Sequence, residues 1–166
     1  DRIWSAVQGK PVDVVVNIQG DEPLVNGSLI DSLIRPMLSD PHLEMATLAH
    51  ELSEEELISE NSVKVILNQN NEAIYFSRFP IPYSREKAAT PISASFKHIG
   101  MYAYRSDFLK KYCESSPVAI ENGEALEQLR ALYMGARIKV ILTEQRSWGV
   151  DSPGDIGVIE RLLLKQ

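Results

Sequence analysis

The sequence predicts an α/β fold: a mixed, mainly parallel sheet flanked by helices, with a small β excursion. Runs rich in β-branched residues alternate with amphipathic helical stretches along most of the chain. The first run, residues 12–18 (VDVVVNI), is nearly continuous in apolar side chains, which is typical of a strand covered on both faces in a parallel sheet. A turn at residues 68–71 joins two further runs as a hairpin, so the sheet cannot be wholly parallel.

Residues 28–104 supply two helices and four strands after the opening run. Ser28 is the expected N-cap of an amphipathic helix that Pro36 should kink or shorten. Ser53 with Glu56 three residues later is a capping box that opens a short helix. The expected strands cover residues 45–52, 63–67, 73–77 and, after a Pro-rich stretch, 97–104.

The second half supplies helices and one more strand. Ser106 is expected to cap a helix that runs to Tyr112. A longer helix over residues 122–134 should end at Gly135, the residue type favoured just past a helix C-terminus. A strand follows at residues 138–142, and the pair Ser152-Pro153 should begin the last helix.

Composition restricts the classes of function. The chain has 166 residues, of which 44% are hydrophobic and 24% charged, which fits one globular domain with a real core. A net charge of −6 disfavours binding to nucleic acid or to an anionic membrane. The single cysteine, Cys113, cannot form an internal disulfide, and no stretch of 18 apolar residues or signal peptide occurs, so we expect a cytoplasmic protein.

The strongest cluster of polar residues is Gln19-Gly20-Asp21-Glu22-Pro23, directly after the first strand. Open α/β sheets bind ligands beyond the carboxyl ends of their strands. Asp21 offers hard oxygen ligands for Mg²⁺, and Gln19 can donate to and accept from sugar hydroxyls or a carboxylate. An ordinary strand-to-helix turn explains the same residues equally well from the pattern alone. The three histidines are not at zinc spacing, and Cys113 has no neighbouring base, so zinc and thiol chemistry are not supported.

Five segments, in the order of the chain, resemble the 3-deoxy-manno-octulosonate (Kdo) cytidylyltransferases, the CMP-Kdo synthetases. They are VVNIQGDEP, VKVIL with IYFSRFPIPYSR, KHIGMYAYR, LEQLR and GVDSPGDI. The resemblance implies a nucleotide-diphospho-sugar transferase-like fold and a homodimer. It also implies Mg²⁺-dependent synthesis of CMP-Kdo and pyrophosphate from CTP and Kdo, for lipopolysaccharide biosynthesis.

The resemblance also implies roles for individual residues. Asp21 and Asp151 match the two carboxylates that hold Mg²⁺, and with Arg78, which matches the arginine that meets the Kdo carboxylate, they form the expected catalytic set. Ser152 and Gly154 stand where the family usually has Thr and Glu, which makes the start of the last helix more flexible. The other matched sugar-binding residues are Gln19, His98, Tyr102, Glu127 and Gln128.

Each of these residues also has an ordinary structural explanation. Asp151 fits a helix-start carboxylate, and Arg78 a solvated residue at a strand end. His98 and Tyr102 are four apart on an expected strand and so face the same side, where core packing is common. Glu127 and Gln128 are separated by about 100° around an expected helix, and surface placement is a serious alternative for Glu127.

The resembling family begins with a strand and a Gly/Arg/Lys-containing loop that wraps the triphosphate, and Asp1-Arg2 looks like the end of its SGTDR motif. We therefore expect residues 1–166 to be the C-terminal two-thirds of one nucleotidyltransferase domain, without the N-terminal third, and to be a poor enzyme alone. Residues 79–95 are the segment expected at a dimer interface. Two other functions stay open: a cytidylyltransferase for another acid sugar such as sialic acid, or a non-catalytic module that binds a sugar acid or nucleotide.

Overall fold

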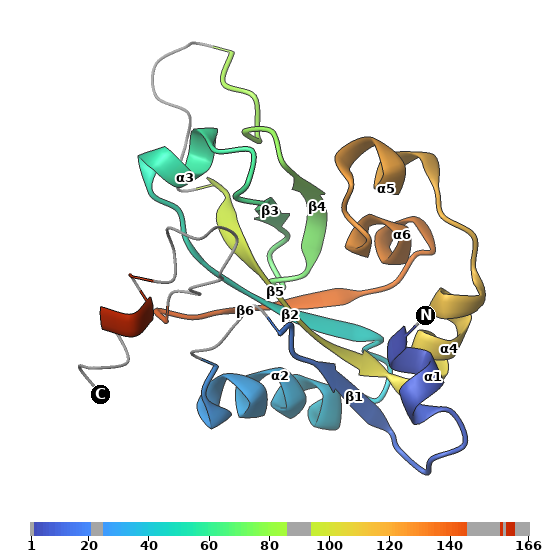
Figure 1. The fold of residues 1–166 in the computed structure, drawn as a ribbon. Coiled ribbons are helices and arrows are strands. Elements are labelled where there is room, and N and C mark those ends of the chain that lie inside the picture. The colour runs from blue at the N-terminus through green and yellow to red at the C-terminus, as the bar shows by residue number, and fades with distance from the viewer. Residues whose placement is uncertain (1, 21–24, 86–93, 146–156, 158, 162–166) are drawn as a thin grey trace.

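One mixed sheet with helices on both faces forms the centre of the molecule (Figure 1). The computed structural model describes residues 2–20, 25–85, 94–145, 157 and 159–161. The strands are β1 (Val14–Asn17), β2 (Met45–Glu51), β3 (Lys64–Leu67), β4 (Ala73–Ser77), β5 (Phe96–Arg105) and β6 (Ile138–Leu142). The helices are α1 (Arg2–Val7), α2 (Gly27–Ser39), α3 (Glu54–Ile58), α4 (Ser106–Glu114), α5 (Ala119–Glu124) and α6 (Gln128–Tyr133).

The strand order is β4-β3-β5-β2-β6, and β1 pairs with β5 outside this path. The mixed α/β fold is thus confirmed, but the strand pairing corrects the expectation of a mainly parallel sheet. Among the described strands only β2 and β6 pair in parallel. The long strand β5 pairs with β1, β2 and β3 and is antiparallel to all three. The apolar run of β1 does reflect cover on both faces: Val15 belongs to the core on one face, and Val14 and Val16 pack against the core on the other. An apolar run reports burial, not the direction of the neighbouring strand.

Helices cover both faces of the sheet, and each face has its own core. On one face, α2 packs Leu29, Leu33 and Met37 against β2 and β5. On the other face, residues of α4 and the α5–α6 region, such as Leu109 and Leu129, pack against β2, β5 and β6. Figure 1 shows α2 on one side of the sheet and α5 with α6 on the other.

Local signals located several elements correctly. The capping box is present: the Ser53 amide donates to Glu56 Oε2 at 2.9 Å, and the Glu56 amide donates to Ser53 Oγ at 3.2 Å. The β3–β4 hairpin forms as predicted, with Asn71 in the left-handed region at φ 54°. The turn at Gly135, where φ is 82°, follows the end of α6.

Three helix boundaries differ from the prediction. Asn26, not Ser28, caps α2, because its Oδ1 accepts the Leu29 amide at 3.1 Å, and the helix continues through Pro36. Ser106 is the first residue of α4 and not its cap, since β5 continues to Arg105. The expected helix over residues 122–134 is two helices, separated where Ala125 turns to φ 51°.

The start of the last helix, predicted at Ser152-Pro153, lies outside the described residues. Within the described part of the chain, no helix combines the length and the apolar character that crossing a membrane requires.

Candidate functional site

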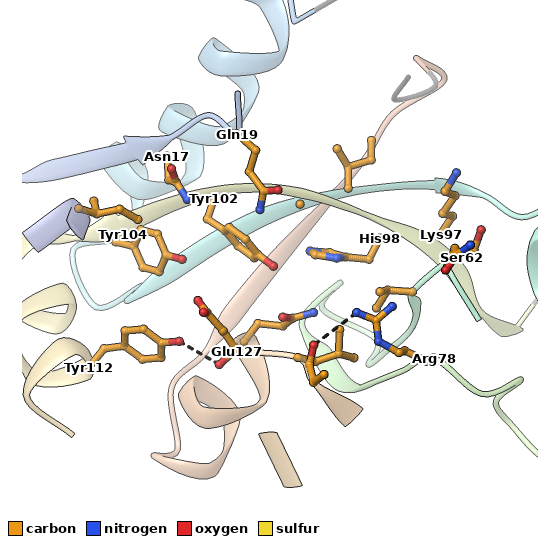
Figure 2. A pocket seen from close by; sticks show the side chains of 18 of the residues that line it. Asn17, Gln19, Ser62, Arg78, Lys97, His98, Tyr102, Tyr104, Tyr112 and Glu127 are labelled. Atoms are coloured by element: carbon orange, nitrogen blue, oxygen red, sulfur yellow. Dashed lines mark hydrogen bonds between the residues drawn. The ribbon is translucent and has the colours of Figure 1, made fainter. Parts of the chain in front are cut away.

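The edge of β5 opposite β2 carries two partners with a gap between them. β3 pairs with this edge at Phe96 and Lys97, and β1 pairs with it at residues 102–105. A pocket of about 490 Å³ opens at this gap, and Figure 2 shows it from close by. Its walls come from the ends of β1 and β4, from the loop before β3, from β5, from α4, and from the start of α6. Because β1 and β3 leave part of this edge of β5 unpaired, there is room for a pocket between them.

Gln19 enters the pocket from the β1 side and lies against β5. A Cβ atom placed on Gly100 would come within 3.1 Å of Gln19 Nε2, so the glycine leaves the room that the amide occupies. The carboxyl ends of β1, β2 and β6 lie at the same edge of the sheet, as the strand directions require. Gln19 thus stands where open α/β sheets bind ligands.

A row of aromatic rings along β5 forms one wall. The ring centroids of His98 and Tyr102 are 5.4 Å apart, and those of Tyr102 and Tyr104 are 5.8 Å apart. Tyr112 of α4 continues the row, 6.3 Å from Tyr104. Burial raises the pKa of Tyr102 and Tyr104 well above the ordinary value, and raises that of Tyr112 to about 12. The three phenols therefore stay protonated at neutral pH and can donate hydrogen bonds.

His98 lies between Phe76 and Tyr102 and is almost completely buried. Its ring meets the Phe76 ring edge to face at a centroid distance of 5.0 Å. The Nε2 atom is 2.9 Å from Thr47 Oγ1 on β2. Burial lowers the pKa of His98 to about 3, so the imidazole is neutral at physiological pH.

Arg78 is held in place by backbone carbonyl groups. Its guanidinium donates to the carbonyl oxygens of Glu124 (2.9 Å), Glu60 (3.1 Å) and Ala125 (3.4 Å). The carboxylate of Glu124 accepts from the Arg78 amide at 2.8 Å and from Ser77 Oγ at 2.7 Å. Among the residues that the structure describes, three of the five guanidinium N–H groups thus have partners and two have none, so these two can bind a ligand.

Lys64 supports the same corner from behind. Its side chain is fully buried, and its ammonium group donates to the carbonyl oxygens of Ser59 at 2.8 Å, Ser62 at 2.6 Å and Arg78. Burial lowers the pKa of Lys64 from its ordinary value. The three carbonyl groups match the three donors of an ammonium, so this cation ties the strand before Arg78 to the loop before β3.

Charge is distributed unevenly along the pocket. Arg78 and Lys97 lie at one end in Figure 2, and Tyr104 and Tyr112 lie at the other. Lys97 is paired with Glu56 at 3.0 Å. Glu127 is exposed at the N-cap of α6, and its carbonyl oxygen accepts from the Tyr112 hydroxyl at 2.9 Å. A ligand with a carboxylate at one end and hydroxyl groups at the other matches this distribution.

Six of the eight predicted site residues line this one pocket: Gln19, Arg78, His98, Tyr102, Glu127 and Gln128. The placement of Glu127 and Gln128 side by side at the start of α6 brings both to the wall, although Gln128 is buried and Glu127 exposed. The two predicted metal ligands, Asp21 and Asp151, lie outside the described residues. Within the described residues, no group of three or more His, Cys, Asp or Glu side chains is arranged to hold a metal ion.

Sequence reasoning missed other residues of the site. Tyr104 could have been found, because it follows Tyr102 by two residues and so shares its face of β5. Asn17 and Ser62 line the pocket as well, but a single polar residue at a strand end or in a loop has no distinctive pattern. Lys64 and Thr47 are polar residues within apolar strands, and their partners are distant in sequence or belong to the backbone.

Comparison with known proteins agrees with this architecture. Residues 1–138 match the family model described as cytidylyltransferase. The chain is 56% identical to the 3-deoxy-manno-octulosonate cytidylyltransferase of Bdellovibrio bacteriovorus, covering 100% of this chain and 68% of that protein. The chain therefore spans about two thirds of the length of this relative.

Solved structures give the same result. The structure of a CMP:2-keto-3-deoxy-manno-octonic acid synthetase complexed with CTP superposes with a TM-score of 0.89 at 36% identity, covering 99% of this chain and 67% of that one. A 4-diphosphocytidyl-2C-methyl-D-erythritol synthase from Anaerococcus prevotii, 11% identical with a TM-score of 0.56, shares the fold alone, that of the nucleotide-diphospho-sugar transferases. From the family match and the identity to the Bdellovibrio protein, the chain belongs to the cytidylyltransferase family, among the 3-deoxy-manno-octulosonate cytidylyltransferases.

Proposed function

We propose that this chain is part of a nucleotidyltransferase that moves CMP from CTP to Kdo, giving CMP-Kdo and pyrophosphate for lipopolysaccharide biosynthesis. One observation carries the proposal: six residues from four separate segments, each matched to a sugar contact, line one pocket. The synthetase structure of the same fold was solved with CTP bound, which supports CTP as the nucleotide. Kdo is an acid sugar, so a pocket with a fixed cation at one end and amide, phenol and carboxylate groups elsewhere suits it.

Arg78 is the residue proposed to bind the Kdo carboxylate. Its guanidinium is oriented by three carbonyl groups, and two of its N–H groups have no partner in the described part of the chain. A carboxylate can accept two hydrogen bonds from a guanidinium group. Gln19, Tyr102, Glu127 and Gln128 are then the proposed partners of the sugar hydroxyls. Their amide, phenol and carboxylate groups supply both donors and acceptors, as a polyol requires.

The proposed reaction is an in-line displacement at the α-phosphorus of CTP. The anomeric hydroxyl of Kdo forms the new O–P bond and loses its proton, and the bond to the bridging oxygen of pyrophosphate breaks. Catalysis of such a step depends mainly on positioning and charge neutralisation. The described residues supply positioning: they hold the sugar beyond the carboxyl end of β1, in the interval between β1 and β3 along β5.

Mg²⁺ is part of the proposal, with Asp21 and Asp151 as its protein ligands. Carboxylate and phosphate oxygens are the ligands that Mg²⁺ prefers, and the ion would neutralise phosphate charge. The chain after Asp21 and the chain before Asp151 meet in the described structure, because Asn26 Nδ2 donates to Gln145 Oε1 at 2.8 Å.

Asp21→Asn and Asp151→Asn are each expected to abolish Mg²⁺-dependent turnover without unfolding the protein. Wild-type activity of either variant at saturating Mg²⁺ would show that the substituted residue is not a metal ligand.

A homodimer through residues 79–95 is also proposed. Phe79 is 72% exposed and Tyr83 is 82% exposed, and both follow β4, the strand at the edge of the sheet. Large exposed apolar side chains of this kind are typical of interaction surfaces. Sedimentation of the intact protein and of its Phe79→Asp variant tests this, and we expect the variant to shift to the monomer.

We propose the cytoplasm as the location of the protein, because CTP is made there.

Release of pyrophosphate from CTP by the intact protein tests the reaction. With Kdo as acceptor we expect rapid release, and with sialic acid little or none. Equal rates with both sugars would make the protein a broader acid-sugar cytidylyltransferase. If CTP binds but no sugar acid supports release, the pocket belongs to a binding module and the proposed reaction is wrong.

A further inference from the structure

Thr47 is a buried hydroxyl with no place in the function described so far. It lies in β2, whose first six side chains are all buried, and its own exposure is 0%. Its Oγ1 atom is 2.9 Å from His98 Nε2, 2.8 Å from the Met101 carbonyl oxygen and 3.2 Å from that of Ile99. These distances involve one donor proton, two carbonyl acceptors and one ring nitrogen whose role depends on its tautomer.

The carbonyl groups need this hydroxyl because the strand pairing is irregular here. Thr47 faces Tyr102 and Leu48 faces Ile99, so Gly100 and Met101 have no partner on β2. Buried carbonyl oxygens that lose their ladder partner usually find a donor elsewhere. The hydroxyl of Thr47 is that donor, and its single proton is directed to the backbone of β5.

The protonation of His98 follows from this. Because the Thr47 proton is directed to a carbonyl group, only a lone pair of Oγ1 is left to face Nε2. The proton between these two atoms must therefore be on Nε2. A neutral imidazole carries one ring proton, so Nδ1 is unprotonated and is a hydrogen-bond acceptor. If Nε2 were unprotonated, the Thr47 hydroxyl would have to donate to it. The lone pairs of Oγ1 and of the Met101 carbonyl oxygen would then face each other at 2.8 Å.

The accepting atom is available to a ligand. Among the described residues, Nδ1 has no hydrogen-bond partner, and His98 is one of the residues that line the pocket. Figure 2 shows the imidazole beside Tyr102 in the row of pocket side chains. A hydroxyl group can donate to this atom, whereas an ionised carboxylate can only repel it.

We propose that Thr47 is a positioning residue that fixes His98 as an acceptor for a sugar hydroxyl and so sets the direction in which the acid sugar binds. The sugar's identity rests on the proposed function; the tautomer does not. The carboxylate then goes to Arg78, which has only donors, and a hydroxyl goes to Nδ1 of His98, which has only a lone pair. An acid sugar entering the other way would set its carboxylate against that lone pair, so the pair of groups selects one orientation.

The tautomer is tested first, without substrate. Long-range ¹H–¹⁵N correlation spectra of the intact protein labelled with ¹⁵N-histidine distinguish protonated from unprotonated ring nitrogens, and His98→Gln assigns the signals. At neutral pH we expect a protonated Nε2 and an unprotonated Nδ1 for His98. A protonated Nδ1, or both nitrogens protonated, overturns the proposal. This measurement needs no Thr47 variant, so it holds even if such a variant fails to fold.

The role of Thr47 is tested next with two variants. Thr47→Val keeps the shape and removes the hydroxyl, and Thr47→Ser restores it. In Thr47→Val we expect Nδ1-protonated His98 to appear in the spectrum and the KM for Kdo to rise about tenfold, the equivalent of one hydrogen bond, with the KM for CTP unchanged. Thr47→Ser should resemble wild type in both. An unchanged tautomer, or equal rises in KM for the two substrates, overturns the proposal; absence of any Kdo turnover in the wild type would instead refute the proposed function.

Discussion

At the scale of single residues, Arg78 shows how one side chain is both fixed and available. Its guanidinium satisfies three backbone carbonyl groups, which removes most of its rotational freedom before a ligand arrives. An arginine held in this way loses little further entropy on binding a carboxylate. The sequence alone indicated a strand-end arginine and a family match, but not the contacts that orient it.

Arg78→Lys is expected to raise the KM for Kdo by about tenfold or more, because a lysine keeps the charge and loses the planar fork. The KM for CTP should change little. Steady-state kinetics with each substrate varied in turn measure both values. Arg35→Lys, at an exposed position of α2, is the matched control and should resemble wild type. Equal losses for both substrates would contradict a role in sugar binding.

Lys64→Met is expected to destabilise the protein by about 2–3 kcal/mol, because three carbonyl oxygens around the ammonium lose their donor. Urea denaturation measures the free energy of unfolding. Lys110→Met, at an exposed position of α4, is the control and should change it by less than about 0.5 kcal/mol. Equal stability of the two variants would show that the buried cation contributes nothing to this corner of the fold.

The low pKa of His98 predicts a pH dependence of stability. The unfolded chain takes up a proton near the ordinary pKa of 6.5, and the native state does so only near 3. Stability therefore falls as the pH drops below about 6.5, by up to about 1.4 kcal/mol per pH unit from this group. Urea denaturation at neutral pH and near pH 5 should show a smaller loss in His98→Gln than in wild type. His42→Gln, at an exposed histidine, should follow wild type; parallel losses in all three proteins would contradict the burial of a neutral His98.

At the scale of elements, the sequence predicts features that depend on neighbouring residues but not features that depend on residues distant in the chain. The capping box at Ser53 and the hairpin at residues 68–71 depend on residues within a few positions, so the sequence predicts them. The antiparallel course of β5 depends on which distant strands pair, and the apolar run in β1 carries no information on this. The break at Ala125 was missed because alanine favours a continuous helix.

Ala125 adopts φ 51° between α5 and α6, a conformation that costs an alanine about 1 kcal/mol and a glycine much less. Ala125→Gly is therefore expected to stabilise the protein by about 0.5–1 kcal/mol in thermal or urea unfolding. Ala119→Gly, at the exposed first residue of α5, is the control and should not stabilise. A loss of stability in Ala125→Gly would mean that the chain does not break at this position.

At the scale of the whole molecule, the sheet builds the site by leaving part of one strand unpaired. β1 and β3 share an edge of β5, and the pocket occupies the interval between them. The family resemblance predicted six residues of its lining, because each stands in a segment that matches the cytidylyltransferases. Neither Thr47 nor Lys64 could be predicted, since those residues act through backbone groups whose positions only the fold determines.

The central claim is that this pocket binds an acid sugar in one fixed orientation. A crystal structure of the intact protein with Kdo and a non-hydrolysable CTP analogue tests it most directly. We predict the Kdo carboxylate on the guanidinium of Arg78 and a sugar hydroxyl on Nδ1 of His98, with Gln19 beside the sugar. A sugar bound outside the pocket, or bound with its carboxylate toward His98, would contradict the account.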